Sequence, residues 1–263
     1  MIISASRRTD IPAFFPQWFS ECLSAGYAEV ANPFNPSQIR RVSLLPEDVD
    51  GFVFWTKYPL PFFSCLDTLE RQGFEYYFQF TLTPYPAEIE PGVPNKPTVT
   101  SIFKKLSNRL GPARIIWRYD PVLISPVFTP EYHLREFDNL CRRLEGHTLK
   151  VIVSFFQPYR KCLKMTISLG IYDPDHHAKE LLIQQLSAIA SSYGICLMVC
   201  ADTEDYAGIS RSKCIDNELF HAHEGEIPYT RAKHQRESCQ CHESVDIGSY
   251  ATCRFGCLYC YAS

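Results

Sequence analysis

Three cysteines stand close together at the end of this chain, in the string ATCRFGCLYCYAS (residues 251–263). Cys253, Cys257 and Cys260 place three thiolates on one tight loop, and Gly256 allows an unusual backbone angle just before the second. A structural zinc site usually takes four ligands from two Cys-x2-Cys knuckles, but only Cys257 and Cys260 form such a pair here. Three thiolates leave one iron of a tetranuclear cluster without a protein ligand. The loop therefore predicts an iron–sulfur cluster with an open coordination position.

Four more cysteines precede this loop: Cys200, Cys214, Cys239 and Cys241. Four thiolates saturate a tetranuclear cluster or a zinc ion, so the seven cysteines divide naturally into three and four. This division predicts an open cluster beside a closed one. The alternative is a single metal site that uses four of the seven, with the others as ordinary buried thiols.

Composition limits the protein classes to consider. The chain has 263 residues, 46% of them hydrophobic, and a formal net charge of −3, which indicates a globular protein with no overall attraction to nucleic acid or anionic membranes. Neither a signal peptide nor a long apolar span is evident, so we expect a cytosolic protein. In a reducing compartment, dense cysteines indicate metal ligands rather than disulfides.

Short apolar runs alternate with helical patterns through the first 200 residues. Several runs are apolar at successive positions, which is typical of strands buried on both faces. The predicted strands are residues 2–6, 28–32, 51–56, 75–82, 114–119, 150–156 and 195–201. The predicted helices are residues 130–144, a segment opened by Asp173 and ended by Gly194, and three less regular segments at 12–25, 59–72 and 98–110.

Repeated strand–helix–strand units predict an α/β fold with a parallel sheet and right-handed crossovers. Seven strands favour a TIM-like (β/α) barrel, complete or incomplete, over an open doubly wound sheet. We expect residues 1–202 to form the barrel core. Residues 203–263 lack a regular pattern and should form a cysteine-rich tail that packs on the barrel mouth.

Polar residues follow the ends of most predicted strands, where parallel α/β folds place their chemistry. Asn32 and Thr81 end the second and fourth strands. Taken alone, an aspartate at such a position can be a helix cap or a turn residue. Together, the basic residues would converge on one rim that suits a carboxylate or phosphate. The candidate catalytic residues are Arg7, Arg8, Asp10, Lys57, Arg118 and Asp120.

The Cys-x3-Cys-x2-Cys spacing, with Tyr259 directly before the last cysteine, resembles the cluster loop of the radical S-adenosylmethionine (SAM) superfamily. The string CRFGCLYCYA is similar to the loop of its spore photoproduct lyase-like branch. The whole chain, from SASRRTDIP through FWTK, FQFTLT and WRYDP to the final YCYA, resembles a bacterial family catalogued as a domain of unknown function, DUF1848.

The radical SAM resemblance implies a [4Fe-4S] cluster on Cys253, Cys257 and Cys260 that binds SAM at its fourth iron, with Tyr259 near the adenine. It also implies hydrogen abstraction from a small or polymer-linked substrate, and an electron donor such as a ferredoxin or flavodoxin. Closed auxiliary clusters occur in that superfamily. The sequence departs from its pattern in two ways: the loop stands at the end of the chain instead of after the first strand, and no Gly-Gly-Glu follows the second strand.

Two other functions use the same cysteines. An electron-transfer protein would carry the clusters without SAM, which the missing Gly-Gly-Glu favours. A zinc-stapled tail could support a binding protein, with Arg40-Arg41 and Arg142-Arg143 available for a nucleic acid or protein partner. The net acidity of the chain weighs against the second of these.

Overall fold

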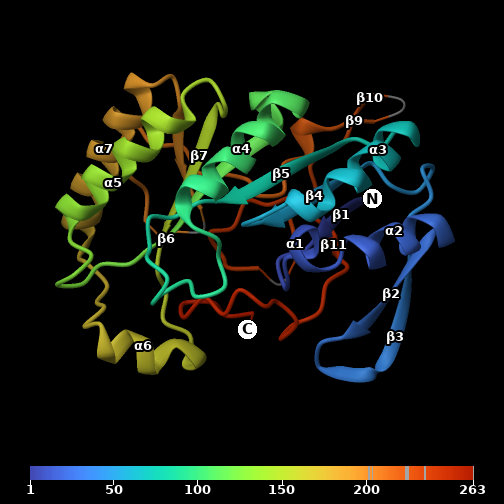
Figure 1. Cartoon of the computed structure of the whole chain (residues 1–263), viewed down its shortest axis with the longest axis horizontal. Helices are drawn as coiled ribbons and strands as arrows, with labels where there is room; N and C mark the ends of the chain where they lie inside the picture. The colour runs from blue at the N-terminus through green and yellow to red at the C-terminus, as the bar shows by residue number, and fades with distance from the viewer. Residues whose placement is uncertain (201, 203, 223–224, 234, 263) are drawn as a thin grey trace.

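The fold, taken from a computed structural model, is a parallel sheet between a layer of helices and an irregular C-terminal tail (Figure 1). The structure describes all residues except 201, 203, 223, 224, 234 and 263. None of the described helices is long and apolar enough to cross a membrane.

Seven parallel strands form the main sheet in the order β11-β1-β4-β5-β6-β7-β8. The strands are β1 (Ile2–Ala5), β4 (Gly51–Thr56), β5 (Tyr76–Thr81), β6 (Ile115–Val122), β7 (Lys150–Phe155), β8 (Cys196–Val199) and β11 (Val245–Asp246). The predicted α/β class and six of the predicted strands are therefore confirmed. Residue 201, the last of the predicted strand 195–201, lies outside the described residues.

The sheet does not close into a barrel. Among the strands that the structure describes, β8 pairs with β7 alone and β11 pairs with β1 alone, so the two edge strands of the sheet are not joined. The seventh strand of the sheet is also not the one that we predicted: β11 comes from the tail and lies parallel to β1, with Ile3 opposite Val245. The tail thus adds a strand to the sheet as well as covering it.

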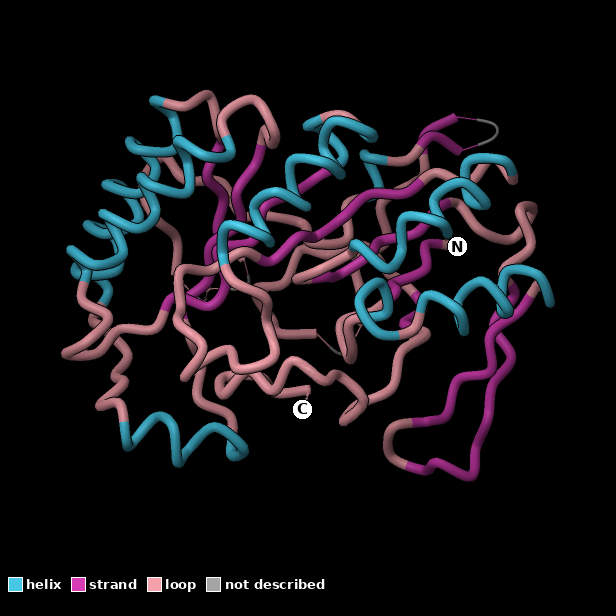
Figure 2. The backbone as a smooth tube through the Cα atoms, viewed as in Figure 1, coloured by secondary structure: helices cyan, strands magenta, loops and turns pink. Residues whose placement is uncertain are grey.

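Residues 28–32 do not join the main sheet, and this prediction was wrong. β2 (Tyr27–Asn32) pairs antiparallel with β3 (Asn35–Ser43) in a separate hairpin that projects from the body of the molecule (Figure 2). Most side chains of β3 are exposed, which an arm outside the core permits. Asn32 therefore lies at the hairpin end and not at the carboxyl end of a sheet strand.

Six helices cover one face of the sheet: α1 (Ile11–Phe14), α2 (Pro16–Ala25), α3 (Phe63–Arg71), α4 (Lys96–Leu110), α5 (Pro130–Leu144) and α7 (His176–Ser192). The helix α6 (Leu163–Ser168) and the 3-10 turn η3 (Arg160–Cys162) lie with the cysteine loop instead, and η4 (Asn217–Leu219) belongs to the tail on the other face. Two further 3-10 turns are η1 (Leu60–Phe62) and η2 (Pro112–Arg114). Thr129 caps α5 as predicted, whereas α7 is capped by Asp175 and not by Asp173. The carboxylate of Asp175 accepts a hydrogen bond from the backbone N–H of Ala178. The helix therefore begins two residues later than the sequence predicted.

Alternate residues of the strands pack against different partners. Phe52, Phe54 and Phe78 point to the helix layer. Val53, Tyr77 and other inward-facing strand residues pack against the tail, including Cys214, Phe220, Cys239 and Cys241. In a closed barrel this second face would be the interior. Here the tail fills that space, so this face of the sheet is covered without closure. The two short strands of the tail, β9 (His221–Ala222) and β10 (Gly225–Glu226), pair with each other in a separate sheet.

Candidate metal centre

The loop of Cys253, Cys257 and Cys260 lies at the carboxyl end of the sheet, directly after β11 (Figure 1). β11 is an edge strand and follows the direction of β1, so the chain leaves it at the same end where β1 and β4 finish. Gly256 has the positive φ (63°) that the sequence suggested. The loop thus follows the strand that is first in spatial order, although it comes last in the chain.

A second loop, residues 84–95, holds the cysteine loop against the sheet. The backbone N–H of Gly92 donates to the carbonyl of Phe255 at 2.8 Å, and the N–H of Leu258 donates to the carbonyl of Ile89 at 3.0 Å. The Phe255 ring packs on Phe14 with centroids 4.6 Å apart. These contacts fix the backbone on both sides of Cys257.

Gly92 is the tightest point of this contact. A Cβ at position 92 would lie 2.7 Å from the Phe255 carbonyl oxygen and 2.8 Å from that of Arg254, and neither backbone atom can yield without moving the loop. We expect Gly92→Ala to lower the free energy of unfolding by about 1–3 kcal/mol, as overpacking does. Urea titration of the fluorescence would measure the loss. Glu88→Ala, at an exposed position of the same loop, should change stability by less than about 0.5 kcal/mol; equal losses would contradict the argument.

Glu90 anchors this second loop and is itself 1% exposed. Its carboxylate accepts from the Lys57 ammonium at 2.8 Å and the Thr83 hydroxyl at 2.7 Å, and it also contacts Lys96 and the Tyr259 hydroxyl. Burial alone would raise its pKa, but the two ammonium groups outweigh burial and hold the pKa of Glu90 at about 2. The carboxylate is therefore ionised, and it ties the cysteine loop to β4 and α4.

The three loop thiols lie in a largely apolar setting. Burial raises the pKa of Cys253 to about 11 and that of Cys257 to about 12, while the positive charge of Lys57 opposes the rise at Cys257. In the absence of a metal the thiols of Cys253 and Cys257 are therefore protonated near neutral pH. A metal that takes them as thiolates must displace these protons, and Lys57 would offset part of the resulting negative charge.

A fourth cysteine lies beside this loop. Cys162, at the end of η3, is 1% exposed, and its Sγ lies 3.8 Å from the carbonyl oxygen of Cys260. Burial and the neighbouring Cys260 raise the pKa of Cys162. The spacing of 98 residues gave no sequence signal for this proximity.

Cys200, Cys214, Cys239 and Cys241 form one group on the inward face of the sheet. The sulfur atoms of Cys200 and Cys214 are 2.9 Å apart, and thiol hydrogen bonds continue from Cys214 to Cys241 and from Cys241 to Cys239. The hydrogen bond from Cys241 lowers the pKa of Cys239 to about 7, in spite of burial. The structure thus brings together the four cysteines that the sequence assigned to a second site.

Arg118 contacts this group directly. Its guanidinium donates to the Cys214 sulfur at 2.9 Å, pairs with Asp120 and lies over the Trp55 ring at 5.0 Å. Burial raises the pKa of Asp120, but the charge of Arg118 and the hydrogen bond from Ser154 lower it below its ordinary value overall. The charge of Lys57 adds to this lowering, so Asp120 lies between the cation beside Cys257 and the cation beside Cys214.

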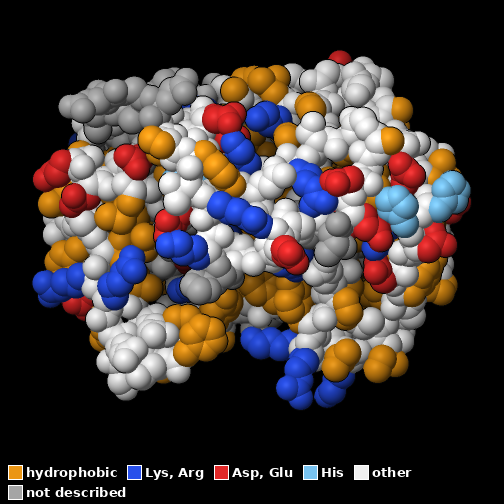
Figure 3. Space-filling view, turned by 180° about the vertical axis from the view of Figure 1, so that it is seen from behind, with side chains coloured by type: hydrophobic (Ala, Val, Ile, Leu, Met, Phe, Trp, Pro, Cys, Tyr) orange, Lys and Arg blue, Asp and Glu red, His pale blue; other side chains and the backbone are white. Residues whose placement is uncertain are grey.

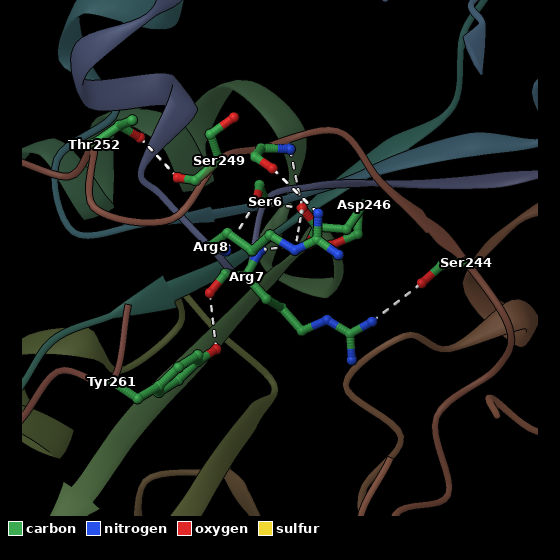
Figure 4. Close-up of polar contacts among 10 residues, drawn as sticks. Ser6, Arg7, Arg8, Ser244, Asp246, Ser249, Thr252 and Tyr261 are labelled. Atoms are coloured by element: carbon green, nitrogen blue, oxygen red, sulfur yellow. Dashed lines mark hydrogen bonds and ion pairs between the residues drawn. The ribbon is translucent and has the colours of Figure 1, made fainter. Parts of the chain in front are cut away.

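Arg7 and Arg8 do not join Lys57 and Arg118 as we expected. They face β11 instead, as Figure 4 shows: Asp246 accepts from the backbone of Arg7 at 2.8 Å and lies 3.9 Å from Nε of Arg8. The Arg7 carbonyl accepts from the Tyr261 hydroxyl at 2.8 Å. The predicted basic rim is therefore divided: Arg7 and Arg8 lie at the edge strand β11, whereas Lys57 and Arg118 both interact with Asp120.

Two other predicted residues have structural partners. Asp10 accepts from the backbone N–H of Ala13 and of Lys57, which makes it both a helix cap and a link to β4; burial raises its pKa to about 6. Tyr259 is 8% exposed, with its ring 5.9 Å from that of Tyr85.

Both cysteine groups offer thiols, which as thiolates are ligands of iron–sulfur clusters and of zinc. Among the residues that the structure describes, no three His, Cys, Asp or Glu side chains surround one point closely enough to hold a metal ion.

Sequence reasoning missed Glu90. This residue stands in the polar string PYPAEIEPG, where a solvated loop is the ordinary interpretation. Asp246, by contrast, stands with Glu237 and Glu243 in a stretch whose acidic residues could order the tail by hydrogen bonding. It does accept hydrogen bonds from Ser4, Ser6 and two backbone N–H groups.

A family model described as a domain of unknown function, DUF1848, matches residues 2–262 of the chain. No curated protein matches the chain.

Proposed function

The chain belongs to the DUF1848 family, and from its two groups of cysteines we propose that it is an iron–sulfur enzyme of radical SAM type. Cys253, Cys257 and Cys260 would hold an open [4Fe-4S] cluster, and Cys200, Cys214, Cys239 and Cys241 a closed auxiliary one. The observation that carries the proposal is the gathering of these seven cysteines into one group of three and one of four.

The position of the loop supports the comparison with radical SAM proteins. Their cluster loop follows the first strand of the barrel, and here the loop follows β11, which occupies the edge of the parallel sheet next to β1. The chain would then be a permuted version of that arrangement, in which the edge strand comes last in the sequence. The permutation offers a physical reason for the late cysteines, which the order along the chain did not.

The residues of this chain would bind the two clusters, pack around them and offset their negative charge. When bound, an open cluster supplies a one-electron reductant with a free iron for a cofactor such as SAM. Lys57 would offset negative charge beside Cys257, and Arg118 beside Cys214. The loop 84–95 and the tail pack against the two groups, and four of the cysteines, Cys214, Cys239, Cys241 and Cys257, are buried. A low-potential electron donor, such as a ferredoxin or flavodoxin, would be required.

Metal and sulfide analysis tests the proposal. After strictly anaerobic purification we expect about eight irons and about eight acid-labile sulfides per chain, as two tetranuclear clusters contain. Electron paramagnetic resonance of the reduced protein should show a signal that changes when SAM is added, because SAM would bind the open iron. Chelation should bleach the brown colour.

Other outcomes identify the other functions. A cluster signal that ignores SAM would indicate an electron-transfer protein. Zinc without sulfide would refute the iron–sulfur proposal and leave the tail as a zinc-stapled segment.

A further inference from the structure

The surface around the cysteine loop is strongly basic, although the chain as a whole is acidic. Residues 157–171 contain Arg160, Lys161 and Lys164 and no Asp or Glu, and residues 249–262 contain Arg254 and no Asp or Glu. The formal charge of the whole chain is −3. The total therefore hides a local excess of positive charge, which is why net charge gave no indication of it.

Contacts place these segments around one mouth. The Tyr159 ring lies 5.3 Å from the Tyr261 ring, which joins the η3–α6 segment to the cysteine loop. Arg236 donates to the Tyr159 hydroxyl, which brings the segment before Cys239 to the same place. Arg8 lies over the Tyr250 ring at 5.4 Å. Three stretches far apart in sequence thus gather around the segment that contains the loop.

The mouth lies between two projecting parts of the molecule. The cysteine loop runs between α6 and the β2–β3 hairpin (Figure 1). In the space-filling view, an indentation at the lower edge has Lys and Arg side chains on one side (Figure 3). Arg160, Lys164, Arg236 and Arg254 are all exposed, and within the described part of the chain none of them forms an ion pair with a carboxylate. Their charge is therefore available to a ligand.

Exposed aromatic rings alternate with these cations. Tyr159, Tyr250 and Tyr261 are 36%, 44% and 40% exposed, and the guanidinium groups of Arg236 and Arg8 touch two of them. Cations that follow a phosphate backbone, with aromatic rings on which bases stack, are typical of surfaces that bind single-stranded nucleic acid. An acidic protein would use the cations but would have no need of stacked tyrosines.

We propose that this basic, tyrosine-bearing mouth binds a single-stranded polynucleotide. The phosphates would lie along Arg160, Lys164 and Arg236, and a base would stack on the exposed Tyr159–Tyr261 pair. This inference does not depend on the metal content of the cysteine groups, because every residue that carries it lies outside them.

Fluorescence anisotropy tests the proposal with the full-length protein and a labelled oligothymidylate of about 20 nucleotides, long enough to cover one binding site. We expect binding at low salt that weakens as salt rises. The triple variant Arg160→Ala/Lys164→Ala/Arg236→Ala should bind at least about tenfold more weakly, and the slope of log affinity against log salt should fall by about 2. The matched variant Arg71→Ala/Lys105→Ala/Arg135→Ala, at exposed positions of α3, α4 and α5, should stay within about twofold, because it removes the same charge elsewhere.

The stacking contribution is tested separately. Tyr159→Leu should weaken binding about fivefold or more, since a stacked base contributes roughly 1–3 kcal/mol, whereas Tyr159→Phe keeps the ring and should bind like the wild type. Polyglutamate of similar charge serves as the competitor. Absence of binding at low salt would overturn the proposal. So would polyglutamate competing equally with no effect of Tyr159→Leu, since that result indicates an acidic protein as the partner.

Discussion

Replacing Glu90 by Gln should lower the free energy of unfolding by about 3–5 kcal/mol, the cost of breaking a buried ion pair by removing one partner. The amide would keep the shape of the side chain but would leave Lys57 and Lys96 without their counter-charge, and these ammonium groups are only 12% and 25% exposed. Glu88→Gln is the matched control, because it makes the same change at an exposed position of the same loop. Urea unfolding of the two variants beside the wild type measures the difference.

The effect should depend on pH in a defined direction. The folded-state pKa of Glu90 is lowered from 4.5 to about 2, so the stability that its charge supplies is present above pH 4.5 and lost as the pH falls toward 2. A lowering of this size corresponds to about 3 kcal/mol. The gap in stability between wild type and Glu90→Gln should therefore be widest near neutral pH and narrow in acid. A gap that stays constant from pH 6 to about 2.5 would mean that the carboxylate is not ionised, against the lysine contacts.

The sheet could be predicted from sequence because its strands are buried on both faces. β4, β5 and β7 contain few exposed positions, and long apolar runs of this kind are hard to mistake. The hairpin β2–β3 was predicted wrongly because Ala28, Val30 and Ala31 resemble a short buried strand, while its partner strand is mostly polar. The sequence pattern contains nothing that distinguishes an arm from a sheet strand.

The edge of the sheet beside β1 could not be predicted, because β11 has only two residues. Val245 and Asp246 are too few to show a periodicity, yet they cover the free edge of β1 and start the cysteine loop. The inward face of the sheet is filled by an irregular segment whose order depends on long-range contacts, such as the Tyr77 and Gln79 side chains donating to the carbonyl of Cys214. Local patterns contain no information on such contacts.

The cysteine groups were easier to anticipate than the residues around them. Thiols in this number have few uses in one chain, so residue type and spacing alone separated the group of three from the group of four. Lys57, Arg118 and Asp120 were selected as strand-end residues, and they do lie between the groups. Glu90 could not be selected, since its importance comes from two lysines and a tyrosine that meet it only in the folded chain.

Separate cysteine variants should divide the metal content of the protein in two. We expect Cys257→Ala to lose about four of about eight irons, together with any response to SAM, because it removes a ligand of the open cluster. Cys241→Ala should also lose about four irons but keep the response to SAM, since it lies in the other group. Cys141→Ala, a fully buried core cysteine in α5, should keep the full iron content and controls for loss of a buried thiol. Iron and sulfide assays with electron paramagnetic resonance provide the measurement.

The pattern of loss, more than its size, decides between one site and two. If a single site used four of the seven cysteines, the variant of a ligand would empty the protein completely and the variant of a non-ligand would leave its metal content unchanged. If the two sites are independent, each variant keeps what the other loses, and the double variant holds no iron. Lys57, Asp120 and Arg118 connect the environments of Cys257 and Cys214, so the sites need not be independent electrically even where they bind metal separately. In that case Cys241→Ala keeps the loop cluster but shifts its reduction potential, because removing the charge of one cluster changes the field at the other.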